Sequence, residues 1–237
     1  ALLADLIPLS VEPARSQRPK IALRSVRYQD RATGVLFGAM TMGAVPQADL
    51  ELTDVEVNLV NSMGLAFSAG DVVIENSHLT APQLVTGSVG GSLTISDAKV
   101  EASSGGLIVG SDRGTSILDS SATAINSGIV VTGALSDFFS GTSDTFGAVT
   151  ISGSELVSLD ADLTDIHPMG EIQIATYFAP ITIDDNPLIR AHGSVTIQTL
   201  DSLVGESGIT FKGNSDVRVG VFKSENATHY RRQNLNI

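Results

Sequence analysis

The segment ITIDDNPLIRAHGS, residues 181–194, carries the residue types of an acid/base site. Asp184 and Asp185 are adjacent, and His192 follows Asp184 by eight residues. Paired carboxylates near a histidine can perform hydrolytic chemistry when their geometry is right. The same residue types can also form a turn and a spacer. The pattern around the segment distinguishes the two interpretations.

Seven segments of the chain repeat one motif, which begins with two apolar or Thr positions separated by one residue. Period-two alternation of this kind predicts a strand with one buried face. The pairs are Leu50/Leu52, Val72/Ile74, Leu93/Ile95, Thr115/Ile117, Val149/Ile151, Ile181/Ile183 and Ile209/Phe211.

Two residues after each pair stands Asn, Asp or Gly, the residue types that tolerate left-handed backbone angles in a tight corner. The seven positions are Asp54, Asn76, Asp97, Asp119, Gly153, Asp185 and Gly213. Asp185 is therefore explained as a corner residue, without any catalytic role.

Further strands are expected on both sides of each corner. Upstream of the pairs lie VLFGA at 35, LAFSA at 65, LVTGS at 84, LIVGS at 107, IVVTG at 129, IQIAT at 172 and VTIQT at 195. Downstream, the chain turns apolar again at Val57, Leu79, Val100, Ala122, Leu156 and Leu188, whereas the seventh segment has Asp216 there, next to Val217.

Repetition at this spacing predicts an all-β fold, a single-stranded parallel β-helix (β-solenoid) of about seven coils with three short strands per coil. We assign residues 35–221 to the solenoid trunk, residues 1–34 to an N-terminal basic arm or cap, and residues 222–237 to a C-terminal basic tail or cap. A β-sandwich is the structural alternative, but it does not explain a corner residue repeated at coil spacing.

Composition limits both the core and the partners. Hydrophobic residues make up 42% of the 237 residues but aromatics only 5%, with no Trp and no Cys, so we expect a core of Val, Ile, Leu and Ala without disulfides or thiolate sites. The net charge of −12 argues against nucleic acid as a partner. No apolar run approaches the ~20 residues of a membrane-spanning helix. The opening ALLADLIPLS lacks the basic start of a signal peptide, so an exported chain would already have lost its signal.

The charges are distributed unevenly along the chain. Residues 1–34 hold six Lys/Arg against three acids, and residues 212–237 hold five against two, so an acidic trunk carries a mildly basic segment at each end. RPKIALRSVRYQ is expected to form a strand with Lys20, Arg24 and Arg27 on its outward side, and Arg231 and Arg232 lie in the C-terminal tail. These segments either protect the strand edges at the ends of the solenoid, or bind the acidic trunk of a neighbouring copy and build a filament by strand addition.

Two insertions are the candidate binding loops, because insertions in solenoids leave the stack on its outside. Residues 134–147 contain Phe138, Phe139 and Phe146, and residues 160–170 contain Asp160, Asp162, Asp165 and His167. One hypothesis is a platform for a glycan or a cell-surface ligand, with carboxylates that could hold calcium. The alternative is an aromatic cap over the trunk with solvated acids. No cofactor is predicted.

The Asp-Asp and His-Gly motifs of residues 184–185 and 192–193 resemble those of pectin-cleaving glycoside hydrolases, which are right-handed β-helices. In that family the two motifs lie on different coils, whereas Asp184 and His192 fall on one coil here, and the family's Asn-Thr-Asp and Arg-Ile-Lys motifs have no counterpart. We therefore predict no catalytic residue. A carbohydrate-active enzyme or carbohydrate-binding protein stays the alternative hypothesis.

Segments such as GGSLTISDAKVEASSGGLIVGS resemble the haemagglutinin-type solenoid of bacterial surface adhesins over residues 35–221. The stretch RPKIALRSVRYQDRATGVLFGAM is faintly similar to Gram-negative pilus-system surface proteins. These resemblances imply a non-enzymatic, secreted structural or adhesive protein, an adhesin or a filament subunit, at the surface of a bacterial cell. The open strand edges at the two ends of the predicted solenoid lead us to expect self-association through the end strands.

Overall fold

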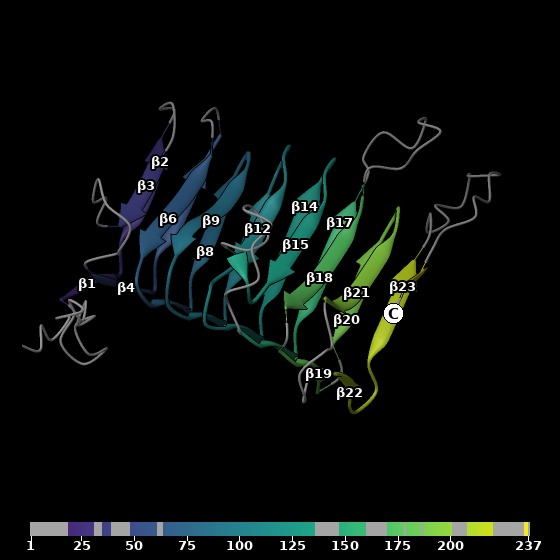
Figure 1. The fold of residues 1–237 in the computed structure, drawn as a ribbon. Coiled ribbons are helices and arrows are strands. Elements are labelled where there is room, and N and C mark those ends of the chain that lie inside the picture. The colour runs from purple at the N-terminus through teal and green to yellow at the C-terminus, as the bar shows by residue number, and fades with distance from the viewer. Residues whose placement is uncertain are drawn as a thin grey trace, which may run out of the picture.

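Over the residues that the structure describes, the chain forms a parallel β-solenoid of eight coils, and each coil contributes one strand to each of three parallel sheets (Figure 1). The computed structural model describes residues 19–30, 35–38, 48–60, 64–135, 147–159, 170–177, 179–185, 187–200, 208–219 and 235–236. The predicted fold class is confirmed, with eight coils in place of about seven. The first and last coils lie at opposite ends of the stack (Figure 1).

Strands equivalent in the coil lie side by side in each sheet. The first sheet contains β1 (Lys20–Arg24), β4 (Asp49–Thr53), β7 (Val72–Glu75), β10 (Leu93–Ser96), β13 (Thr115–Leu118), β16 (Val149–Ser152), β19 (Ile181–Asp184) and β22 (Ile209–Phe211). The second contains β2 (Arg27–Asp30), β5 (Glu56–Leu59), β8 (His78–Ala81), β11 (Lys99–Ala102), β14 (Ser121–Ile125), β17 (Glu155–Leu159), β20 (Leu188–Ala191) and β23 (Asp216–Val219). The third contains β3 (Val35–Gly38), β6 (Leu65–Ala69), β9 (Leu84–Val89), β12 (Leu107–Gly110), β15 (Ile129–Thr132), β18 (Ile172–Tyr177), β21 (Val195–Leu200) and β24 (Leu235–Asn236).

The core consists of aliphatic rows that run along the stack, because equivalent inward positions pair from coil to coil. One row of the first sheet is no more than 1% exposed at any position: Leu52, Ile74, Ile95, Ile117, Ile151 and Ile183. Burying each such side chain stabilises the fold by about 1.5–3 kcal/mol. Phe67 is the one aromatic side chain among the buried hydrophobic residues that the structure describes, as the composition predicts.

Thr115 occupies an inward position that is aliphatic in the other inner coils. Its hydroxyl donates a hydrogen bond of 2.7 Å to the carbonyl oxygen of Thr132, and it lies 3.2 Å from the hydroxyl of Ser111. A buried hydroxyl is tolerated when it is hydrogen-bonded, so the pair Thr115/Ile117 fits the repeat.

All seven predicted corner residues have a left-handed backbone conformation. Their φ angles lie between 46° and 67°. Gly adopts this backbone region freely and Asn and Asp tolerate it, whereas it is unfavourable for most other residues. An eighth corner, at Ser25 with φ 53°, turns the chain between β1 and β2. The single strand predicted for RPKIALRSVRYQ is therefore wrong, because Ser25, a residue type absent from the other seven corners, bends the chain between two strands.

A ladder of buried serines satisfies the backbone next to these corners. The Ser77 hydroxyl accepts a hydrogen bond from the N–H of Val55, and that of Ser120 accepts one from Ala98, both at 3.0 Å. The Ser154 hydroxyl accepts from the N–H of Ser120 at 3.1 Å. Each serine thus joins its own coil to the preceding one at a bend where the strand ladders are interrupted.

Leu188 is the apolar residue five positions after Ile183 in the sequence repeat, but it is not the residue that faces inward. Ile189 is fully buried and pairs with Leu156, whereas Leu188 is half-buried and pairs with Glu155. The corner of the seventh coil has one extra residue, so that Pro187 takes the position after the corner that Ser154 holds in the sixth coil. A shift of one residue exchanges the two faces of a strand.

Both terminal segments contribute strands to the stack. Residues 20–30, which the sequence assigned to a basic arm or cap, form β1 and β2 and pair in parallel with β4 and β5. Residues 235–236, assigned to the C-terminal tail or cap, form β24 and pair with β21. The coil pattern therefore extends on both sides of residues 35–221.

The insertion at 134–147 leaves the trunk through a narrow neck. A Cβ atom on Gly133 would collide with the carbonyl oxygen of Gly147, so the two backbone segments meet where only glycine fits. Ala134 and Leu135 are buried directly after the neck, and the N–H of Leu135 donates to Ser111. The first residues of the insertion therefore belong to the trunk.

Replacing Ser120 with alanine tests the serine ladder. Ser120→Ala leaves the buried N–H of Ala98 without its acceptor, which should lower the free energy of unfolding by about 1–3 kcal/mol. Urea unfolding followed by circular dichroism measures the change. The matched control is Ser116→Ala, on the outward face of β13, for which we expect less than about 0.5 kcal/mol. Equal effects of the two variants would contradict the structural role of the ladder.

Candidate functional site

A polar groove of about 1020 Å³ follows the corners between the first and second sheets. Residues from the first seven coils line it, beginning at Arg27 and ending at Leu188. Its length follows from the repeat, because equivalent corners lie one strand spacing apart, roughly 4.8 Å.

Two rows of side chains form the groove. The corner row contributes Asp54, Asn76, Asp97, Asp119 and Gly153. The second row holds the first residues of successive strands of the second sheet, which pair in register: Arg27, Glu56, His78, Lys99, Ser121, Glu155 and Leu188. Between the rows lie the buried residues after each corner, among them Ser77, Ser120 and Ser154.

The groove is acidic, with five carboxylates against two cations among its lining residues. Both cations are paired within the chain, Arg27 with Glu56 at 3.1 Å and Lys99 with Glu101 at 3.2 Å. The Asn76 side chain donates a hydrogen bond to the carboxylate of Asp54, one coil earlier. Neighbouring coils are thus linked by polar side chains on the outside as well as by apolar ones inside.

Such a groove can hydrogen-bond an extended polar chain. Asp97 and Asp119 stand at corners of adjacent coils, so that two carboxylates stack in one groove. This is the arrangement that a carbohydrate-active enzyme on a β-helix would need. The described residues that line the groove include no Phe, Tyr or Trp on which a sugar ring could stack.

The Asp-Asp and His-Gly motifs do not meet. Asp185 is a corner residue with φ 58°, and Asp184 ends β19 in the first sheet. His192 follows β20, is 8% exposed, and donates its backbone N–H to the carbonyl oxygen of Ser158. The four residues of β20, roughly 13 Å of extended chain, separate the two motifs.

The predicted binding residues lie outside the part of the chain that the structure describes. They are Phe138, Phe139 and Phe146 of the first insertion, and Asp160, Asp162, Asp165 and His167 of the second. Arg231 and Arg232 of the predicted assembly set also lie outside it. Within the described residues, no group of three His, Asp or Glu side chains is arranged to hold a metal ion.

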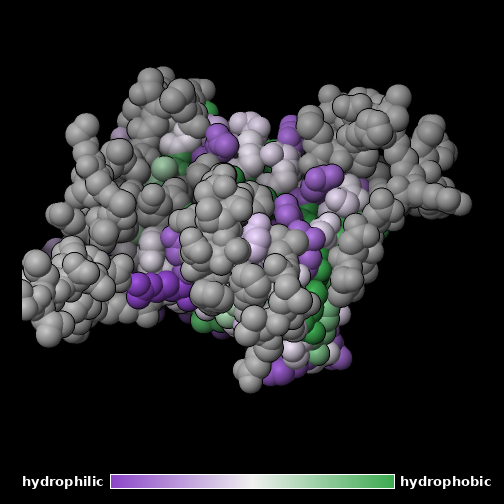
Figure 2. Space-filling view, in the orientation of Figure 1, coloured by the Kyte–Doolittle hydropathy of each residue, from purple (hydrophilic) through white to green (hydrophobic). Residues whose placement is uncertain are grey.

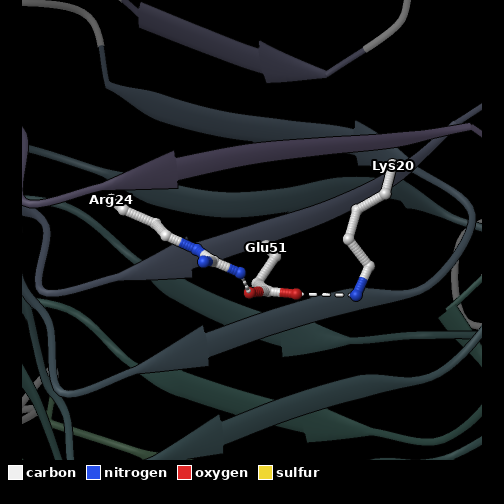
Figure 3. Close-up of polar contacts among 3 residues, drawn as sticks. All are labelled: Lys20, Arg24 and Glu51. Atoms are coloured by element: carbon white, nitrogen blue, oxygen red, sulfur yellow. Dashed lines mark hydrogen bonds and ion pairs between the residues drawn. The ribbon is translucent and has the colours of Figure 1, made fainter.

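The other predicted assembly residues bind acids of their own chain. Lys20 and Arg24 both contact the carboxylate of Glu51 on the next coil, at 2.7 and 3.0 Å (Figure 3). The hydrogen bonds from Lys20 and then Arg24 lower the pKa of Glu51. The first coil is therefore attached to the second by ion pairs along its outer face.

The last coil has an ion pair within one strand. The guanidinium of Arg218 donates to the carboxylate of Asp216 at 2.8 Å through Nε, and this bond lowers the pKa of Asp216. The side chains of Asp216 and Arg218 are 43% and 56% exposed, so both stay accessible to solvent.

One of the two rows of the groove follows from the corner pattern of the sequence, which places the corner residues in line. The strand and corner pattern does not indicate the second row, which consists of Arg27, Glu56, His78, Lys99, Ser121 and Glu155. The signal was present, since each of these residues follows its corner by two positions.

Comparisons with protein families, with curated proteins and with solved structures found no match to this chain. Among the described residues there is no helix with the length and apolar character needed to cross a membrane.

Glu51→Gln should loosen the first coil at neutral pH. The pKa of Glu51 is lowered in the folded chain, so its stabilising effect is complete above the ordinary Glu pKa, about 4.3. The effect is lost as the pH falls through the lowered value. Hydrogen exchange at pH 7 should be about two- to fivefold faster in residues 20–24 of the variant, the magnitude of exposed ion pairs.

The difference between Glu51→Gln and the parent chain should shrink when exchange is repeated at a pH below the lowered pKa of Glu51, because the parent carboxyl is then protonated. Glu155→Gln, in the sixth coil, is the control and should leave exchange in residues 20–24 unchanged. An equal difference at both pH values would show that the charge of Glu51 is not what holds β1.

Proposed function

We propose that this chain is a non-enzymatic structural or adhesive β-solenoid at the surface of a bacterial cell, either an adhesin or a filament subunit. The main support is the equivalence of the corner residues. Asp, Asn, Ser and Gly all occupy the corner with the same left-handed conformation, and Gly153 and Gly213 have no side chain to react. The position selects for backbone conformation, which explains the carboxylates without catalysis.

The polar side chains near the corners support the same proposal, because many are engaged in holding coils together. The buried serines bond to backbone groups of neighbouring coils, and Asn76 bonds to Asp54. Use of polar side chains along the whole stack suits a stiff rod, in which each coil must be held to the next.

The alternative, a carbohydrate-active or carbohydrate-binding protein, draws its support from the groove. Asp97 and Asp119 face the same open groove from adjacent coils, and an enzyme of this fold would place its acids in that way. A purely adhesive role for the groove needs only hydrogen bonding to an extended glycan, with no acid of raised pKa.

Location and turnover together test the proposed function. On intact cells of the source bacterium, a protease that cannot enter should remove the chain, while a cytoplasmic control protein survives. The purified chain should release no new reducing or unsaturated ends from neutral and acidic polysaccharides. A protected chain would contradict the surface location, and sustained turnover would contradict the non-enzymatic role.

Glycine substitutions separate a corner from a catalytic acid. Asp97→Gly and Asp119→Gly retain the backbone conformation that the corner needs, so the thermal midpoint should change little, by less than about 4 °C. Asp119→Val should be less stable than Asp119→Gly by about 1–2 kcal/mol, because a β-branched residue is strained at φ 47°. If the chain cleaves a polysaccharide and a folded Asp119→Gly variant does not, the result would support the enzyme hypothesis and place Asp119 in its active site.

A further inference from the structure

The two end coils have strand edges that no other described strand covers. β22 and β23 are the last strands of the first and second sheets, and β1 and β2 are the first. In a parallel sheet, alternate residues direct both backbone groups to the same neighbouring strand. A strand at the end of the stack therefore has every second N–H and C=O directed away from the chain's own coils.

The hydrogen bonds of the inner coils show which backbone groups these are. Leu50, Val72 and Ile181 occupy one row of the first sheet, and each donates its N–H to a carbonyl oxygen of the following coil. Asp49 lies one residue before Leu50, in the neighbouring row, and donates its N–H to Pro19 of the preceding coil. By the same rule, Ile209 and Phe211 direct their backbone groups away from the seventh coil. At the other end, Lys20, Ala22 and Arg24 direct theirs away from the second.

The end coils also expose hydrophobic residues at inward positions. Ile21 and Phe211 are 37% and 38% exposed, whereas the equivalent Leu50 and Leu52 of the second coil are 2% and 0% exposed. Hydrophobic residues also reach the surface near the C-terminal coils (Figure 2). The exposure arises from position in the stack, so one more coil on either end would bury these side chains.

The two ends match each other when the rows of the solenoid are continued from the eighth coil into the first coil of a second copy. Ile209 then stacks on Ile21, and Phe211 stacks on Leu23, since both pairs occupy the same rows. The N–H of Ile209 would face the carbonyl oxygen of Lys20, as the N–H of Leu50 faces that of Asp71 within the chain.

The charges at the two ends support the same register. Asp216 and Arg27 occupy one row of the second sheet, so the stacked copies bring them together as Arg27 and Glu56 are brought together, at 3.1 Å, within the chain. Lys212 and Arg24 would meet as like charges. Both are exposed at a corner, where solvent and salt screen the repulsion.

We propose that a second copy of this chain binds head to tail by parallel strand addition, with the eighth coil of one copy stacked on the first coil of the next. The contact is heterologous, so it repeats without closing and builds a filament. Eight coils at the strand spacing give an axial repeat of about 38 Å. The inference rests on the proposed structural role and names its partner.

Two variants, each blocked at one end, test the polarity of the contact. Phe211→Lys places an ammonium group on the last coil, and Ile21→Lys places one on the first, where burial in an assembly would be costly but exposure in the monomer is not. Each variant alone should stay monomeric in sedimentation velocity. Mixed one to one, they should form a heterodimer, because the unblocked first coil of Phe211→Lys can bind the unblocked last coil of Ile21→Lys. Nothing longer should form, because both ends of that heterodimer are blocked.

The parent chain should form filaments with an axial repeat of about 38 Å in electron micrographs of a concentration series. Val60→Lys is the matched control, since Val60 is 58% exposed on the side of the second coil, and it should assemble like the parent chain. A parent chain that stays monomeric at every concentration would overturn the inference. Homodimers of either blocked variant would overturn it too, because they require like ends to meet.

A charge exchange provides a second, independent test. Arg27→Glu and Asp216→Arg should each raise the concentration for half-maximal assembly by about two- to fivefold, and the double variant should restore it. The two residues lie in the first and last coils of one chain, so rescue can arise only between copies. Absence of rescue in a double variant with a parent-like circular dichroism spectrum would contradict the proposed register.

These outcomes are separable from those of the proposed function. Filaments formed by a protein that proves to be inside the cell would sustain the contact and remove the surface role. A monomeric chain exposed on intact cells would remove the contact and keep the surface role.

Discussion

One backbone constraint governs this solenoid: each coil needs a single residue in the left-handed conformation between its first and second strands. The eight coils meet it with Asp, Asn, Ser or Gly at φ between 46° and 67°. Stacked coils bond to each other in register, so a corner that turned elsewhere would interrupt the strand pairing above and below it. The serine ladder depends on the same bend, because the corner is where a backbone N–H needs a side-chain acceptor.

The acidic groove follows from this constraint. Asp and Asn tolerate the left-handed region better than other residues with side chains, so a repeated corner collects carboxylates in a row even where no chemistry is performed. The row includes Gly153, next to Asp119, which indicates that conformation governs the choice. A groove of this origin is still a surface on which hydrogen-bonding groups repeat at one strand spacing, and an extended ligand could use it.

Each inner coil has a described coil stacked on both of its sides, whereas each of the two end coils has one on a single side. Inner coils bury their aliphatic rows and pair both strand edges, whereas Ile21 and Phe211 stay partly exposed on the end coils. The first coil is reinforced along its outer face by the pairs of Lys20 and Arg24 with Glu51. The same geometry that adds one coil to another within the chain is available for adding one chain to another.

The sequence by itself determined the strands, the corners and the composition of the core. Period-two alternation and left-handed preference are properties of residues close together in the chain, so Leu52, Asp54 and their six sets of equivalents could be recognised locally. Only the tertiary structure decided the register between coils. It showed Ser25 to be a corner, moved Ile189 inward in place of Leu188, and aligned Arg27 with Glu56 at the groove. Register depends on hydrogen bonds between residues 18 or more positions apart, and one extra residue in a corner exchanges the faces of a strand without a clear mark in its composition.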